Sequence, residues 1–338
     1  MKLKRKASMS TRLIFVLILL TILIGILIIG YIYLSNAISE INSTGNDLIK
    51  SELEVVEGLM LLLIFLTVSF VIYLCKSLFD IYATSKENQF IVEINKMTSK
   101  IDQQTSIEKL DFHNDRFVKV VGNYASANKG NINQIYAALI QTYMLKSMKT
   151  ESDFEKLKIY TNILVRAYAE SYNMQEIYTD KRIQRISEAA VMYDIGKLGT
   201  PGYILYKEAN LNIEDFEIAK RHAIVGYDLA KSISPEARKG SFDQYVQDIA
   251  GFHHERYDGT GYPWGVKGEE IPFIARVIAL ITTYDTITRD RPYKKAMSHE
   301  EAVLLINKEK GLYFDPKIVK IFNGIEKEFK KIKDKDLK

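Results

Sequence analysis

The stretch GFHHERYDGTGYPWGVKGEEIP, residues 251–272, joins a pair of histidines to a loop rich in turn-forming residues. His253 and His254 end an apolar helical pattern, and the residues that follow predict a tight loop. These turn-forming residues are Asp258, Gly259, Gly261 and Pro263. Imidazole is a good ligand for iron, manganese or zinc, so two histidines beside a rigid turn favour a metal site. A surface pair of histidines is the alternative.

A third histidine and an aspartate extend this set. His222 lies in NIEDFEIAKRHAIVGYDLAKSI, residues 212–233, which predicts a helix capped by Asn212. His222 falls on the apolar stripe of that helix, where a hydrogen-bonded core histidine is the alternative to a ligand. An aspartate ends the apolar run VMYDIGKLG at 191–199, and a carboxylate can bridge metal ions. The plausible four-ligand set is Asp194, His222, His253 and His254.

The rest of the chain after residue 131 predicts an all-α fold. Long apolar-periodic segments dominate it, and the alternation typical of strands is scarce. The basic C-terminal stretch EKEFKKIKDKDLK interleaves acids with its lysines, which favours a solvated helix end over a surface for a nucleic-acid polymer. The single cysteine excludes an internal disulfide.

Two apolar runs predict a membrane anchor over residues 1–79. Residues 13–34 carry no charge, and 22 residues at about 1.5 Å each span a hydrocarbon core of roughly 30 Å. A cleaved signal peptide is the alternative, although its apolar core should measure only about 7 to 15 residues. The second run, residues 58–75, returns the chain across the membrane and extends towards residue 79.

The charges that flank these runs predict the orientation, because basic residues stay on the cytoplasmic side. The basic residues before the first run are Lys2, Lys4, Arg5, Lys6 and Arg12. The connecting loop holds one lysine against five acids, which are Glu40, Asp47, Glu52, Glu54 and Glu57. Both termini and the soluble domain are therefore expected in the cytoplasm. The loop is too short to fold as a sensor.

Residues 80–130 predict a helical linker. Residues 80–120 alternate apolar and charged positions without glycine or proline, which predicts helix running off the membrane. Pairing with a second copy to make a homodimer is left open, because the heptads are too few to decide it. The stretch at 122–131, with Gly122, Gly130 and several asparagines, predicts a break, and we expect the soluble domain over 131–338.

The order of the motifs resembles the HD-GYP family of cyclic di-GMP phosphodiesterases. The motifs in chain order are YDIGK, LGTPGYIL, KRHAIVG, HHERYDGTGYPWGVKGEEIPFIARVIAL and YDTITRDRPYKKA. The resemblance covers about residues 131–325, and its HHExxDGxGYP and DRPYK elements are specific. It implies a helical domain in which carboxylates and imidazoles hold two or three metal ions over a phosphodiester. It also implies a bacterial protein, here of the cytoplasmic (inner) membrane.

The resemblance implies roles for eight residues that this chain keeps. Asp194, His222, His253 and His254 match ligands of the family's second metal, and Asp194 and Lys197 are the expected catalytic residues. The residues that match groups holding the dinucleotide's phosphates and guanines are Lys197, Tyr262, Arg291 and Lys294. Asp285 and Asp290, in the last motif, are expected to be structural.

Three groups of the family pattern are missing, and all belong to its first metal. Tyr193 stands where the family's HD pair has its histidine, and Thr282 stands where an aspartate is expected. An upstream ligand histidine is also expected, yet no histidine lies between His113 and His222. Tyrosine and threonine are neutral near pH 7 and are weak ligands. We expect one divalent ion, a second site that is empty, and Tyr193 filling the vacated space.

Three functions remain compatible with this pattern. The first is a membrane-anchored receptor that binds cyclic di-GMP with little or no hydrolysis. The second is an active or slow phosphodiesterase, because a single metal can still activate water. The third is a protein-interaction scaffold that binds no nucleotide and docks a partner such as a cyclase.

Overall fold

The computed structural model describes residues 9–42, 47–104, 106–207, 210–290 and 295–334. These residues form α-helices and short 3-10 turns, joined by loops. Within the described ranges the only β-type pairing is one isolated bridge between Lys310 and Phe314. The predicted all-α fold is confirmed.

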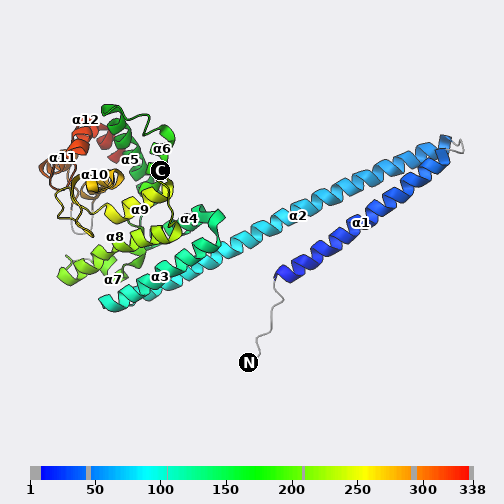
Figure 1. Ribbon diagram of the computed structural model, residues 1–338, viewed down its shortest axis with the longest axis horizontal. Coiled ribbons are helices and arrows are strands. Elements are labelled where there is room, and N and C mark those ends of the chain that lie inside the picture. The colour runs from blue at the N-terminus through cyan, green and yellow to red at the C-terminus, as the bar shows by residue number, and fades with distance from the viewer. Residues whose placement is uncertain (1–8, 43–46, 105, 208–209, 291–294, 335–338) are drawn as a thin grey trace, which may run out of the picture. The chain divides into compact units, whose positions relative to one another are not determined.

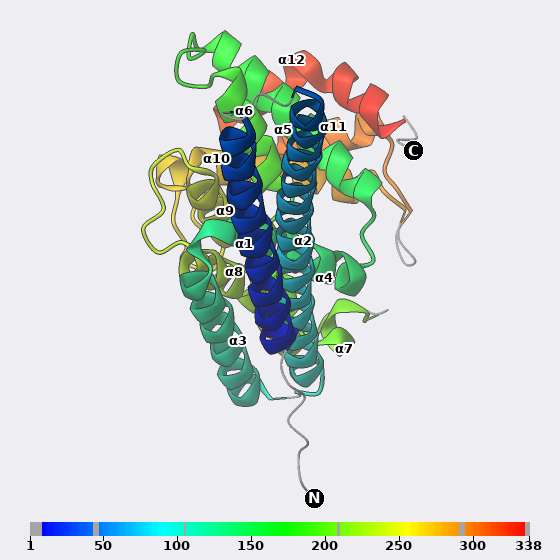
Figure 2. The same cartoon turned by 90° about the vertical axis from the view of Figure 1, so that its right-hand side faces the viewer.

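The chain forms two compact units, Met1–Asn88 and Gln89–Lys338. The first unit contains α1 (Met9–Asn42) and the first part of α2 (Asp47–Asp102), which lie side by side (Figures 1 and 2). Two stretches are long and apolar enough to cross a membrane: Thr21–Glu40, with a mean hydropathy of 2.0, and Glu54–Ser77, with 2.6.

The break in the linker differs from the prediction. Helix α2 ends at Asp102 and α3 spans Ile107–Ala127, so the helical linker is interrupted between these residues. Gly122 lies inside α3, where it permits close packing on α8 (Ile213–Ile233), since a Cβ there would lie 2.9 Å from Ser232 Cβ. The second interruption is the short turn η1 (Lys129–Asn131). Here a glycine serves helix packing and does not end a helix.

The second unit is a bundle that surrounds one continuous hydrophobic core. Its further helices are α4 (Ile132–Ser147), α5 (Glu151–Ser171), α6 (Asp180–Ala190), α7 (Gly202–Leu205), α9 (Phe242–Phe252), α10 (Phe273–Ile287), α11 (His299–Lys308) and α12 (Pro316–Lys333). The turns η2 (Ile195–Gly199) and η3 (Gly268–Glu270) complete it. Helix α8 packs on α3, α9 and η2, whereas α5 packs on α6, α10 and α12. Aromatic side chains such as Tyr143, Tyr160 and Phe329 are fully buried in this core.

Side-chain caps fix where several of these helices begin. Asn212 accepts a hydrogen bond of 2.7 Å from the backbone N–H of Asp215, which confirms the predicted cap of α8. Thr150 and Asp153 form a capping box at the start of α5. Such caps satisfy backbone donors that a helix leaves unpaired and contribute about 1 kcal/mol each. They therefore fix the register of the helices that carry the site.

The last residue of α2 contacts the segment that begins at Asp194. Asp102 pairs with Lys146 of α4 at 2.9 Å and accepts a hydrogen bond of 3.0 Å from the backbone N–H of Gly202. Lys146 is buried and also donates to the carbonyl oxygen of Leu198 at 3.1 Å. Burial lowers the pKa of Lys146, and the neighbouring carboxylate of Asp102 acts in the opposite direction.

Candidate metal centre

Asp194 is placed by a close approach between two backbones. It precedes η2, and Gly196 in that turn packs directly on α8. A Cβ on Gly196 would lie 2.9 Å from Gly226 Cα and nearer still to the carbonyl oxygen of His222. Only glycine fits there without movement of one backbone. This contact brings the carboxylate of Asp194 beside the ring of His222.

The histidines of this site are oriented by carbonyl oxygens of their own helices. Nδ1 of His222 lies 2.6 Å from the carbonyl oxygen of Ala219, and Nδ1 of His253 lies 2.9 Å from that of Ile249. A carbonyl can only accept, so each Nδ1 carries the hydrogen and each Nε2 keeps its lone pair. Both Nε2 atoms are thereby prepared to bind a cation.

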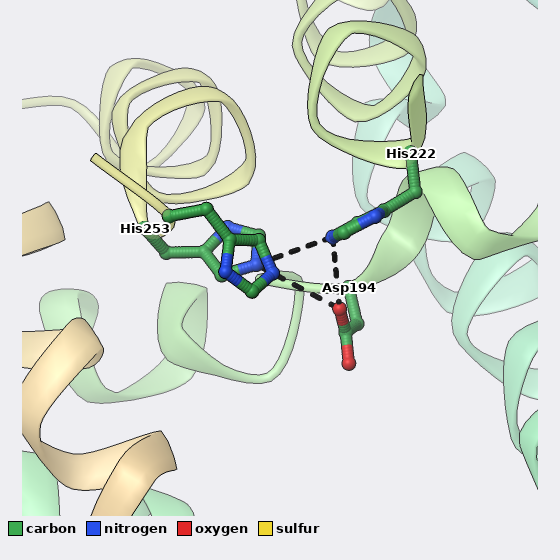
Figure 3. A group of neighbouring side chains, drawn as sticks. Asp194, His222 and His253 are labelled. Carbon is green, nitrogen blue, oxygen red and sulfur yellow. Dashed lines mark hydrogen bonds and ion pairs between the residues drawn. The ribbon is translucent and has the colours of Figure 1, made fainter. Parts of the chain in front are cut away.

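The four predicted ligands converge. Nε2 of His222 lies 3.4 Å from Nε2 of His253, and the two atoms lie 3.4 Å and 3.7 Å from Oδ1 of Asp194. Figure 3 shows these three side chains directed at one another. With His254 included, each residue offers a donor atom within 4.8 Å of every other.

The donor set fits a divalent metal ion. Oδ1 of Asp194 is buried and has no hydrogen-bond partner among the described residues, which is costly without a cation beside it. Three imidazoles and one carboxylate suit iron, manganese or zinc. The residues that would hold the ion are therefore Asp194, His222, His253 and His254.

The other oxygen of Asp194 has protein partners. Oδ2 accepts hydrogen bonds from Lys197 Nζ at 2.6 Å and from the hydroxyl of Tyr143 at 3.3 Å. Burial alone would raise the pKa of Asp194, but the Lys197 ammonium acts most strongly in the opposite direction, and the pKa lies well below its usual range. Asp194 is therefore a carboxylate throughout the physiological range.

The pKa values of two histidines keep them neutral and able to bind metal. Burial lowers the pKa of His222 to about 4, although Asp194 acts in the opposite direction. Burial, followed by the neighbouring rings of His253 and His222, lowers the pKa of His254 well below its ordinary value. A metal ion would therefore not have to displace protons from these rings near pH 7.

This arrangement predicts an acid sensitivity of the metal-free protein. Between about pH 6.5 and pH 4 the unfolded chain protonates His222 while the folded chain does not, so stability falls as pH falls through this window. The loss for this residue should reach at most about 3 kcal/mol. The measurement is the unfolding temperature of chelator-treated protein at several pH values. The variant His222→Gln should show a smaller pH dependence, and a wild-type midpoint that is constant over this window would contradict the assignment.

The hydroxyls of Tyr193 and Thr282 both make hydrogen bonds to other protein groups. The hydroxyl of Tyr193 accepts a hydrogen bond from Lys149, and the hydroxyl of Thr282 donates to Ile278 of its own helix at 2.8 Å. Burial, and then the Asp194 carboxylate, raise the pKa of Tyr193 well above its ordinary value, so this side chain is neutral.

A pocket of about 340 Å³ adjoins the four-donor cluster on the side of Tyr193. Its lining combines cluster residues with side chains of α10 and of the α4–α5 connection. The lining residues include Lys149, Tyr193, Lys197, Thr282, Asp285 and Arg289. A second pocket, of about 360 Å³, reaches His222, His254, Lys197 and Tyr262 from another side. Lys197 borders both pockets.

The loop after His254 holds Tyr262 against the cluster. The ring of Tyr262 stacks on that of His254, with centroids 4.7 Å apart and planes at 20°. Glu255, which the sequence reasoning did not single out, organises this loop: its buried carboxylate accepts from the backbone N–H groups of Trp264 at 2.7 Å and Gly265 at 3.2 Å. Its place inside HHExxDGxGYP was the signal available in the sequence.

The remaining predicted residues lie elsewhere or outside the described ranges. Arg291 and Lys294 fall in 291–294, which the structure does not describe. Asp285 was expected to be structural, and it pairs with Arg289 at 3.0 Å while also lining the pocket. His113 lies on α3 and lines a separate pocket with Arg116.

Comparison with known protein families matches residues 132–318 to the HD domain family. The chain therefore belongs to the HD domain family, as the motifs predicted. Two similar proteins are named cyclic di-GMP phosphodiesterase. One, from Thermotoga maritima, is 38% identical over 173 residues, which cover 50% of this chain and 44% of that protein. The other, from Vibrio cholerae, is 34% identical over 170 residues, covering 50% and 35%.

A third relative differs in the substrate that its name states. It is 3'3'-cGAMP-specific phosphodiesterase 3 of Vibrio cholerae, which is 31% identical over 171 residues, covering 51% of this chain and 34% of that protein. The chain spans less than half the length of each of these relatives.

Proposed function

We propose that this protein is a membrane-anchored receptor for cyclic di-GMP that uses one divalent metal ion and hydrolyses the dinucleotide slowly or not at all. The observation that carries the proposal is a contrast within one site. Four donors converge, and one of them, Oδ1 of Asp194, has no hydrogen-bond partner among the described residues. The hydroxyls of Tyr193 and Thr282, by contrast, make hydrogen bonds to other protein groups.

The loss of hydrolysis follows from what a second ion contributes. In two-metal sites the paired ions generate hydroxide and stabilise both the attacking and the leaving oxygen. A neutral phenol and a neutral hydroxyl cannot substitute for imidazole and carboxylate ligands in holding that second ion. One bound ion would supply Lewis acidity for a phosphate oxygen, which supports binding more than cleavage.

Binding rests on groups that this chain retains. Lys197 borders both pockets and the metal cluster, so its ammonium can donate to a phosphate while it neutralises Asp194. Tyr262 lines the second pocket beside His254, where its ring offers a surface for a nucleobase. Arg291 and Lys294 are assigned to the dinucleotide by their place in DRPYK. The names of the relatives support the same ligand class.

The membrane assignment rests on the two apolar stretches Thr21–Glu40 and Glu54–Ser77. The basic residues before the first stretch support an orientation with both termini and the soluble unit in the cytoplasm, at the inner membrane of a bacterium. The output would be a change of conformation passed to a second copy or to a cyclase-type partner.

The test separates binding from turnover on the full-length protein in lipid nanodiscs, loaded with manganese or iron. Calorimetry should show binding of cyclic di-GMP, and chromatography of the same samples should show almost no linear product. Parallel titration with 3'3'-cGAMP establishes which dinucleotide is preferred. Rapid turnover of either dinucleotide overturns the receptor assignment, and absence of binding to both favours the scaffold.

A slow phosphodiesterase is the second candidate, and the intact four-donor cluster favours it. A single ion with an open position can activate water. In that case Asp194→Ala and His222→Ala should abolish activity together with metal content, whereas activity that survives both changes would come from a contaminant.

A further inference from the structure

The pocket beside the four-donor cluster is lined by three cationic side chains, and two of them have carboxylate partners. Lys197 pairs with Asp194 at 2.6 Å. Arg289 pairs with Asp153 at 2.6 Å and with Asp285 at 3.0 Å. Among the described residues, Lys149 has no carboxylate within ion-pair distance. Burial lowers the pKa of Lys149, whereas the carboxylates of Asp194 and Asp285 act in the opposite direction from beyond ion-pair distance.

The position of Lys149 is fixed despite the missing carboxylate. It stands between α4 and α5, where Met148 adopts the left-handed conformation and Thr150 caps α5. Its Nζ donates to the hydroxyl of Tyr193 and lies 4.4 Å from the centroid of that ring. This is the only hydrogen bond of the ammonium within the described part of the chain, so two of its three donors have no protein acceptor there.

Arg289 supports the same segment from the other side. Its guanidinium joins Asp285 of α10 to Asp153 of α5, and Asp153 is the residue that completes the capping box with Thr150. The residue next to Lys149 is thus tied to α10. This network holds the backbone beside Lys149, whereas the side chain of Lys149 is held by its hydrogen bond to Tyr193.

We propose that Lys149, positioned by Tyr193, is a phosphate-binding residue that donates to a phosphate oxygen of the bound cyclic dinucleotide in the place where the family has its first metal ion. The inference rests on the proposed function, because it assigns a ligand-binding role within the same site. Tyr193 is a positioning residue, because its hydroxyl, at the place of the family's HD histidine, holds the ammonium of Lys149.

An ammonium in the place of a metal ion would support binding of the dinucleotide but not its hydrolysis. An ammonium attracts a phosphate through charge and hydrogen bonds, as a metal ion does. It has no coordination position for water and so does not generate a metal-bound hydroxide. Replacing an ion with Lys149 would therefore keep the anion and remove the nucleophile, and the positive charge would also repel a second cation from this space.

The test compares dinucleotide affinity with metal content in full-length protein carrying one manganese ion. Lys149→Gln should raise the Kd for cyclic di-GMP about tenfold or more, because hydrogen bonds to charged groups are worth about 1.5–3 kcal/mol and 1.4 kcal/mol corresponds to tenfold. Manganese stoichiometry by elemental analysis should stay unchanged. Lys149→Arg should retain more affinity than Lys149→Gln, and Tyr193→Phe should cause a smaller loss. The matched control is Lys158→Gln on the surface of α5, where Lys158 pairs with Glu155, and its Kd should equal that of the wild type.

The outcomes distinguish the two proposals. If the wild type binds cyclic di-GMP and Lys149→Gln binds it equally well, the role of Lys149 is wrong and the receptor function stands. If the wild type itself does not bind, the receptor function fails and this inference fails with it. A loss of manganese in Lys149→Gln, or equal losses in Lys149→Gln and Lys149→Arg without a loss in Tyr193→Phe, contradicts a direct phosphate contact. Circular dichroism of each variant establishes that the helical fold is retained.

Discussion

The substitution Asp194→Asn is expected to remove the metal ion. Asp194 supplies the only carboxylate of the four-donor cluster, and its Oδ1 is the buried oxygen without a hydrogen-bond partner. An amide of the same shape carries no charge and binds divalent ions poorly. Since loss of an outer-shell partner already weakens metal affinity roughly 10–100-fold, loss of this ligand should weaken it at least about a hundredfold. The measurement is metal per chain after loading and desalting.

The control for this experiment is Asp228→Asn. Asp228 lies on α8, the helix that carries His222, and it is not part of the cluster. Its metal content should match that of the wild type. Full occupancy in Asp194→Asn would mean that the ion binds elsewhere, and the proposed four-donor metal site would be wrong.

The substitution Gly196→Ala is expected to destabilise the second unit strongly. A methyl group at this position would overlap the backbone of α8 at His222 and Gly226, and a backbone cannot rotate away as a side chain can. Overpacking of a core costs about 1–3 kcal/mol when side chains can yield, so we expect about 3 kcal/mol or more here. The unfolding temperature should fall by several degrees, and metal affinity should fall with it, because η2 carries Asp194 away from His222.

Gly324→Ala is the matched change in open space. Gly324 lies within α12, and a Cβ there would meet no atom within 4 Å. Alanine is favoured over glycine inside a helix by about 1 kcal/mol, so this variant should be as stable as the wild type or slightly more stable. If both alanine variants unfold at the same temperature, the packing argument at Gly196 is wrong.

Those features that depend on short spacings could be predicted from the sequence. His253 and His254 are adjacent, and His222 lies on the stripe of a helix whose cap, Asn212, was identified beforehand. Asp194 was identified in the motif YDIGK, and the resemblance to the HD-GYP family predicted that all four donors bind one metal ion. Helix periodicity likewise predicted the all-α fold, because the spacing of apolar residues that marks a helix lies within a single short segment of the chain.

Other features depend on contacts between distant segments and carried no local signal. Lys149 reaches Tyr193 across 44 residues, and Arg289 reaches Asp153 across the bundle, so nothing in the pattern around either residue marks it. Gly122 was predicted to lie in a break for the same reason. A glycine that ends a helix and one that admits a neighbouring helix look alike until the partner is known.

The buried ammonium of Lys146 makes the end of α2 and the turn that follows Asp194 parts of one linked equilibrium. It binds Asp102 and the carbonyl of Leu198 at once, so neither can move without breaking or carrying the other. A ligand that holds η2 in place must stabilise the last turn of α2 by the same free energy with which that turn favours the ligand. Asp102 is the last residue of α2, so this reciprocity concerns the C-terminal turn of that helix and the turn that carries Asp194.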